Sequence, residues 1–187
     1  MESAAQPPVA PAKLLVPALI GALVAIALGV YGNEHTPTGK SILGDGLFFS
    51  ATLNMKAWLA TIALGFGCFQ VLSALRIYGR IGSGEPPSWL PTAHKVSGAL
   101  ALVVSLPVAY HCLWALGFQD TTTRVLIHSL AGCFFYGAFA AKIVIVESKR
   151  LPGIALPIAG GTVFAALVAI WLTSALWFFD NIGFPEF

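Results

Sequence analysis

The sequence predicts an all-α membrane protein, a bundle of five transmembrane helices, and two observations carry this prediction. Hydrophobic residues make up 57% of the 187 residues, and the mean hydropathy is +0.83. The ten basic and eight acidic residues are only 10% of the chain, whereas about a quarter of a soluble domain is charged. This composition excludes a soluble enzyme and a nucleic-acid-binding protein. The apolar residues form long runs without alternation, which excludes a membrane β-barrel.

Five apolar stretches are long enough to cross a bilayer, which takes about 18 residues or more. They cover residues 14–31, 51–78, 92–118, 122–146 and 154–179 and form one domain, 14–187. Residues 1–13 are a tail without the basic start of a signal peptide, so we expect the first span to be retained.

Proline and glycine mark the limits of the later spans. Pro91 precedes the third span, Gly117 closes it, and Pro152-Gly153 opens the fifth. Pro107 lies inside the third span and is expected to bend it, which neighbouring helices can accommodate in a membrane.

The basic residues predict the orientation of the bundle. Seven lie on the side of the N-terminus, and three, Lys40, Lys56 and Arg124, lie on the other side. The positive-inside rule therefore predicts a cytoplasmic N-terminus and an external C-terminus, in the cytoplasmic membrane of a bacterium.

Small residues in the spans suit close helix packing. Gly21, Ala25 and Gly29 are spaced four apart on one face of the first span. Similar close packing is expected at other glycines: Gly65, Gly98, Gly160 and Gly161.

Four histidines carry most of the polar chemistry of the spans: His35, His94, His111 and His128. An ionisable side chain inside a span is costly and is therefore a functional candidate. The turn between the third and fourth spans is centred near residues 119–120, so His111 and His128 are expected at one depth, about a turn and a half below the external surface. Two imidazoles at one depth on neighbouring helices could ligate the iron of a b-type haem.

Two residues near His128 fit this hypothesis. Arg124 lies four residues earlier on the same helix face, nearer the surface, where it could bind the haem propionates. Gly132 lies one turn deeper and would let a flat porphyrin approach the backbone. The alternative is that His111 and His128 bond each other or a carbonyl group. Consecutive helices also pack only about 8–10 Å apart, so a haem requires the hairpin to open.

His94 and His35 give weaker indications of a functional role. His94 begins the third span on the cytoplasmic side, where it could contact a second haem, a quinone or a lipid headgroup, or have only a structural role. His35 lies in the external loop and is expected to be solvated, with a contact to a haem or a partner as the alternative. The three cysteines, Cys68, Cys112 and Cys133, contain no CxxC pair and are interpreted as small buried side chains.

Four segments resemble a bacterial family of small five-helix membrane proteins whose members are often encoded beside Rieske-type iron–sulfur proteins. These segments are residues 90–95, 106–112, 128–142 and 171–177. The paired histidines are also loosely similar to transmembrane b-type cytochromes, which usually have four ligands in two layers, whereas this chain offers one pair. The resemblance implies redox work and a Rieske-type protein or other redox subunits as partners.

The leading hypothesis is a membrane b-type cytochrome subunit that passes electrons between a quinone pool and an external redox partner. It would bind one haem b through His111 and His128, with a second haem or a quinone near His94. The alternative is a cofactor-free anchor or assembly subunit of a larger membrane complex. No nucleophile–base pair is present, so we do not expect catalysis by this chain alone.

Overall fold

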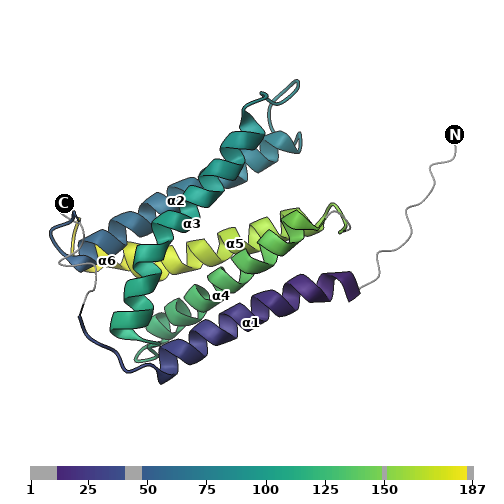
Figure 1. Cartoon of the computed structure of the whole chain (residues 1–187). Helices are drawn as coiled ribbons and strands as arrows, with labels where there is room; N and C mark the ends of the chain where they lie inside the picture. Colours follow the sequence, from purple (N-terminus) through teal and green to yellow (C-terminus); the bar gives the residue numbers. More distant parts are fainter. Residues whose placement is uncertain (1–11, 41–47, 149–150, 185–187) are drawn as a thin grey trace, which may run out of the picture.

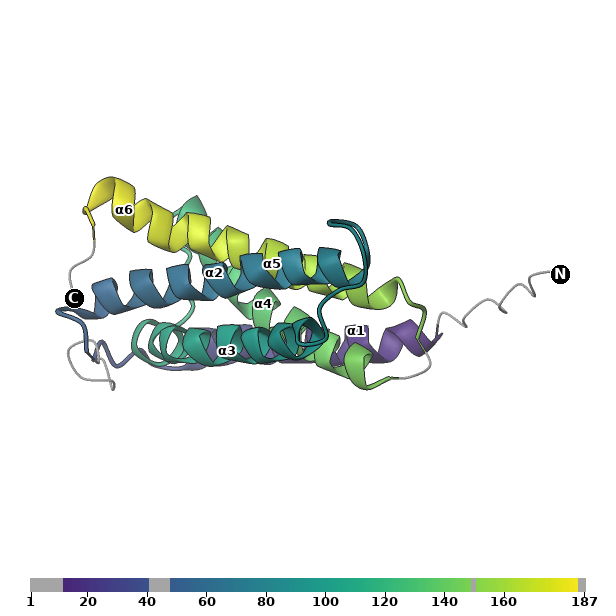
Figure 2. The same ribbon diagram turned by 90° about the horizontal axis from the view of Figure 1, so that it is seen from above.

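The fold is known from a computed structural model, which describes residues 12–40, 48–148 and 151–184. Within these ranges every regular element is helical (Figure 1). Five helices are long and apolar enough to cross a membrane, as predicted. Seen from above, they run along roughly one direction (Figure 2). Most of the predicted tail, residues 1–11, lies outside the described residues.

The predicted spans agree with the helices to within a few residues at each end. The first four long helices are α1 (Ala12–Glu34), α2 (Thr52–Ile77), α3 (Leu90–His111) and α4 (Thr123–Glu147). The fifth span is α5 (Ala155–Trp171), which continues into α6 (Trp177–Asn181). Two π-helical segments interrupt the regular pattern: η1 (Cys112–Leu116) extends α3, and η2 (Leu172–Leu176) joins α5 to α6.

Local chemistry sets the ends of α3 and α4. Pro91 lies in the first turn of α3, where its missing N–H costs no hydrogen bond. Gly117 ends η1 with a φ of +71°, a conformation that glycine adopts without steric cost. Thr122 caps α4, since its hydroxyl accepts a hydrogen bond from the backbone N–H of Val125 at 3.3 Å.

The hairpin formed by α3 and α4 is open. α3 packs mainly against α2, whereas α4 packs against α1 and α5, and the two consecutive helices make almost no direct contact. Figure 1 shows α3 following α2 and then turning toward the ends of α1 and α4. Pro107 lies within α3 and removes one backbone hydrogen bond there, which explains the turn. Consecutive helices α3 and α4 are therefore farther apart than a directly packed hairpin.

Helices α1 and α4 pack closely through small residues. A Cβ on Gly21 would lie 2.8 Å from the carbonyl oxygen of Gly137, and a Cβ on Gly29 would lie 3.9 Å from Sγ of Cys133. The predicted role of this face of the first span is confirmed. Of the other four glycines, only Gly98 has a close neighbour, the side chain of Gln70.

The molecule has a small core and a large apolar surface. The core joins α2, α4 and α5 around Ala63, Phe135 and Leu167. Large side chains on α1 remain exposed, with Leu23 at 66% and Ile26 at 61%. An apolar surface of this kind on helices of spanning length contacts lipid.

Candidate functional site

The open hairpin contains a cavity of about 310 Å³. All five long helices contribute to its wall, together with η1, η2 and α6. One side is formed by Ala57, Ala60, Ala175 and Phe178, which pack together as a buried cluster. The deeper end is closed by Tyr136 of α4, whose hydroxyl donates to Oγ of Ser105 on α3 at 2.9 Å. The cavity is thus mostly apolar and is shaped by helices far apart in sequence.

His128 lines this cavity with one ring nitrogen held by a threonine of the fifth span. Its Nδ1 lies 3.1 Å from the hydroxyl of Thr173. That hydroxyl has one hydrogen, which it donates to the carbonyl of Ala169 at 2.7 Å. Thr173 therefore accepts from Nδ1–H of His128, which leaves the lone pair on Nε2. The backbone carbonyl of Ile170 also lies near the ring. Held by Thr173 at Nδ1, His128 resembles a metal-ligating histidine whose second nitrogen is held by a neighbour.

Arg124 fixes α4 to the end of the fifth span. Its guanidinium donates to the carbonyl oxygen of Thr173 at 2.5 Å and lies 4.1 Å above the ring of Trp177. A cation over an indole face is attracted by the ring quadrupole. Arg124 also lines the cavity, and most of its five N–H donors have no described protein partner.

Gly132 borders open space on the same side as His128. A Cβ built on Gly132 would meet no atom within 4 Å. Arg124, His128 and Gly132, spaced four apart in the sequence, all line the one cavity. The helix backbone at Gly132 is therefore accessible to a flat molecule in this space.

Both π-helical segments border the cavity, which the sequence patterns did not predict. Cys112 and Leu116 of η1 and Thr173 and Ala175 of η2 are in its wall. Such segments are rare and occur frequently at functional sites. The adjacent hydroxyls of Thr173 and Ser174 in an otherwise apolar span are the sequence signal that could have indicated this region.

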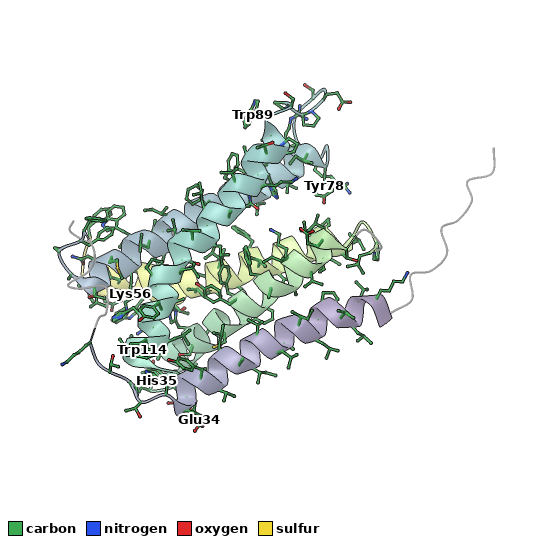
Figure 3. All side chains as sticks on the ribbon, in the orientation of Figure 1. Glu34, His35, Lys56, Tyr78, Trp89 and Trp114 are labelled. Atoms are coloured by element: carbon green, nitrogen blue, oxygen red, sulfur yellow. The ribbon has the colours of Figure 1, made fainter. Side chains whose placement is uncertain are left out.

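Lys56 is a second residue that the sequence reasoning did not assign to the site. It belongs to α2, is partly buried and lines the cavity. Figure 3 shows it at the same end of the molecule as His35 and Trp114, opposite Tyr78 and Trp89. Its position five residues into an apolar helix was the available signal.

His111 lies apart from this arrangement. It ends α3 but is not in the wall of the cavity, although the next residue, Cys112, is. Successive helical residues are separated by about 100°, so the two side chains face different directions. Both ring nitrogens of His111 are buried without a hydrogen-bond partner among the described residues. Lys56 lies within electrostatic range of both His111 and His128.

His94 lies near the opposite end of the bundle. Its Nδ1 is 2.7 Å from Oγ of Ser73, and that hydroxyl donates to the carbonyl of Phe69 at 2.6 Å. Gln70 donates to the backbone oxygen of His94 and to Oγ of Ser97. His94 is therefore joined to α2, and the structure does not bring it together with another histidine.

His35 has specific contacts despite its position near the external loop. Its Nε2 lies 3.1 Å from the carbonyl oxygen of Trp114. The ring stacks on Tyr31, with centroids 5.1 Å apart, and also contacts Trp114. The prediction of a solvated loop histidine is therefore wrong: His35 attaches the end of α1 to η1.

The described residues contain no cluster of three histidine, cysteine or acidic side chains that could hold a metal ion. The fold and the cavity define a multi-pass membrane protein with a histidine-lined internal site. The chain belongs to a family of unknown function, DUF6529, whose model matches residues 14–186. No significant match was found among curated proteins or among solved structures.

Proposed function

We propose that this protein is a membrane b-type cytochrome subunit that binds haem b in the cavity and transfers electrons. The observation that carries the proposal is His128, which lines the cavity and whose Nδ1–H is bonded to Thr173. Histidine ligands of metals almost always donate their other ring N–H to a neighbour, which fixes the tautomer and the ring orientation.

Other residues of the cavity fit a porphyrin. Gly132 leaves room for a flat ring against α4, and the wall is mostly apolar. Arg124 has unused donors for a propionate. A bound haem would supply one-electron chemistry. The protein would fix its position, exclude water and provide the iron ligand.

We propose on chemical grounds that His111 would be the second residue to hold the iron, which requires its ring to turn toward the cavity. A buried imidazole with two unpartnered nitrogens is costly, and iron would remove that cost at one of them. Because His111 is outside the cavity wall, its role is separable from that of His128 by experiment.

We also propose an orientation in the membrane and redox partners for this protein. An excess of basic residues on the N-terminal side supports a cytoplasmic N-terminus in a bacterial membrane. The cavity then lies toward the external face, where a Rieske-type or other redox subunit could exchange electrons with it. His94, with its Nε2 unbonded by any described residue, is the proposed contact for a quinone near the opposite face.

The visible spectrum of the purified protein tests the haem. We expect a Soret band and, after reduction, an α-band. His128→Ala should abolish both bands, and His111→Ala should keep the haem but convert six-coordinate iron to five-coordinate iron, which binds carbon monoxide. His94→Ala is the matched control, because this histidine lies at the other end of the bundle.

Two results would contradict the proposal. One is the absence of a Soret band even after the protein is titrated with haem, and the other is an unchanged spectrum in His128→Ala. Recovery of stable partner subunits with a haem-free chain would then favour the alternative, a cofactor-free anchor subunit.

A further inference from the structure

Lys56 is a cation in the wall of a mostly apolar cavity and has no counter-ion among the residues that the structure describes. It is partly buried on α2, and no described residue forms an ion pair or a hydrogen bond with it. Among the described residues, no acidic side chain lines the cavity. A charged group within a membrane-spanning helix is costly and generally has a partner, so an anionic ligand in this cavity would stabilise Lys56.

The position of Lys56 distinguishes it from Arg124. The guanidinium of Arg124 is already held between the carbonyl of Thr173 and the ring of Trp177. The ammonium of Lys56 has no such restraint, and its flexible stem can follow a ligand. The two cations belong to different helices, α2 and α4, and both line the cavity with His128.

The polar and apolar parts of the cavity are arranged in order of depth. Lys56 and Arg124 lie near the start of α2 and of α4, at one end of the bundle, whereas Tyr136 and Ile170 line the deeper part. A molecule that fits must therefore have an anionic end and an apolar body. We propose that Lys56 binds a carboxylate of the molecule in this cavity. The inference rests on the proposed function, because it takes that carboxylate to be a haem propionate.

A fatty acid has the same chemistry, a carboxylate on an apolar body, so the test must separate the two sources. The probes are haem b, iron protoporphyrin IX dimethyl ester, in which both carboxylates are blocked, and a fluorescent long-chain fatty acid. Each is titrated into the full-length protein in detergent micelles, as wild type and as Lys56→Met. Lys56→Arg keeps the charge, and Lys40→Met is the control for losing a lysine that lies outside the cavity.

We expect Lys56→Met to bind haem b roughly 10- to 100-fold more weakly than wild type, the effect of one hydrogen bond to a charged group. The same variant should bind the dimethyl ester as wild type does, which also shows that it is folded. Lys56→Arg should bind haem b nearly normally, and Lys40→Met should not differ from wild type.

The outcomes separate this inference from the proposed function. Equal binding of haem b by wild type and Lys56→Met overturns the role of Lys56 and leaves the haem proposal intact. Binding of neither porphyrin overturns the haem proposal. If the fatty acid then binds and its binding depends on Lys56, the carboxylate site is retained and its ligand is a lipid. If the fatty acid does not bind either, both proposals fail.

Discussion

The hydroxyl of Thr173 determines which nitrogen of His128 carries the proton. It accepts from Nδ1 and donates to its own helix at Ala169. A threonine about two turns before the end of the fifth span thus acts on a histidine of another helix. Its effect is positional, because the hydroxyl does not itself need to touch a ligand.

The substitution Thr173→Val tests this positioning, since it keeps the shape of the side chain and removes the acceptor. We expect haem affinity to fall about 10- to 100-fold, as found when an outer partner of a metal ligand is lost. Ser174→Ala is the control, because that hydroxyl also lines the cavity but donates only to the carbonyl of Ile170. Equal affinities in Thr173→Val and wild type would show that the bond to His128 has no role in binding.

At the scale of residues, the sequence predicted what depends on short spacing. Arg124, His128 and Gly132 share a face because residues four apart on a helix do so. Lys56 and Thr173 belong to helices distant in sequence, and only the packing of α2 against the fifth span, and of the fifth span against α4, brings them to the cavity. His111 was paired with His128 from depth alone, and depth does not determine the direction in which a side chain points.

At the scale of elements, the contact between α1 and α4 depends on the absence of side chains. A Cβ on Gly137 would lie 2.9 Å from the Cβ of Ala25, closer than ordinary van der Waals contact. Helix association in a membrane relies on such packing, because lipid removes the hydrophobic driving force between helices. Gly21 and Gly137 therefore determine how closely the first span approaches the fourth.

We expect Gly137→Ala to destabilise the protein by roughly 1–3 kcal/mol, the usual cost of overpacking. Thermal unfolding in detergent micelles, followed by circular dichroism, measures the change. Gly65→Ala is the matched control, since a Cβ there would meet no atom within 4 Å and alanine favours a helix over glycine. An equal midpoint for both variants would mean that α1 is free to move away.

The five spans were predictable because crossing a bilayer requires a long apolar stretch, and such stretches can be seen directly in the sequence. The bend of α3 was predictable for a similar reason, since Pro107 acts locally. The π-helical segments were not, because no residue type specifies them and their extra width depends on neighbouring helices. The contact of His35 with Trp114 also depends on the approach of η1 to α1.

At the scale of the whole molecule, the positions of the basic residues relative to the cavity bear on the orientation of the protein in the membrane. Lys56 and Arg124 were counted as external basic residues, yet both line the cavity. Lys40 then remains as the external basic residue that is outside the site, so the excess on the N-terminal side is larger than the sequence count indicated. This supports the proposed cytoplasmic N-terminus.

Cysteine labelling in intact cells tests the orientation. Thr36 follows α1 and Ser83 follows α2, and both are exposed. In a Cys68→Ala background, Thr36→Cys should react with a membrane-impermeant maleimide, whereas Ser83→Cys should react only after the cells are opened. The reverse pattern would show that the N-terminus is external.

The π-helical segments have a consequence for the length of the chain. A π-helical turn holds one residue more than the α-helical turn it replaces. Loss of a single residue within η1 or η2 would allow the segment to become a regular α-helical turn with side chains about 100° apart, so the residues that remain in the segment would point in new directions. The residues that these segments contribute to the cavity, Cys112 and Leu116 of η1 and Thr173 and Ala175 of η2, would then no longer all face it. The number of residues in these two segments is thus as much a part of the site as the identity of the residues.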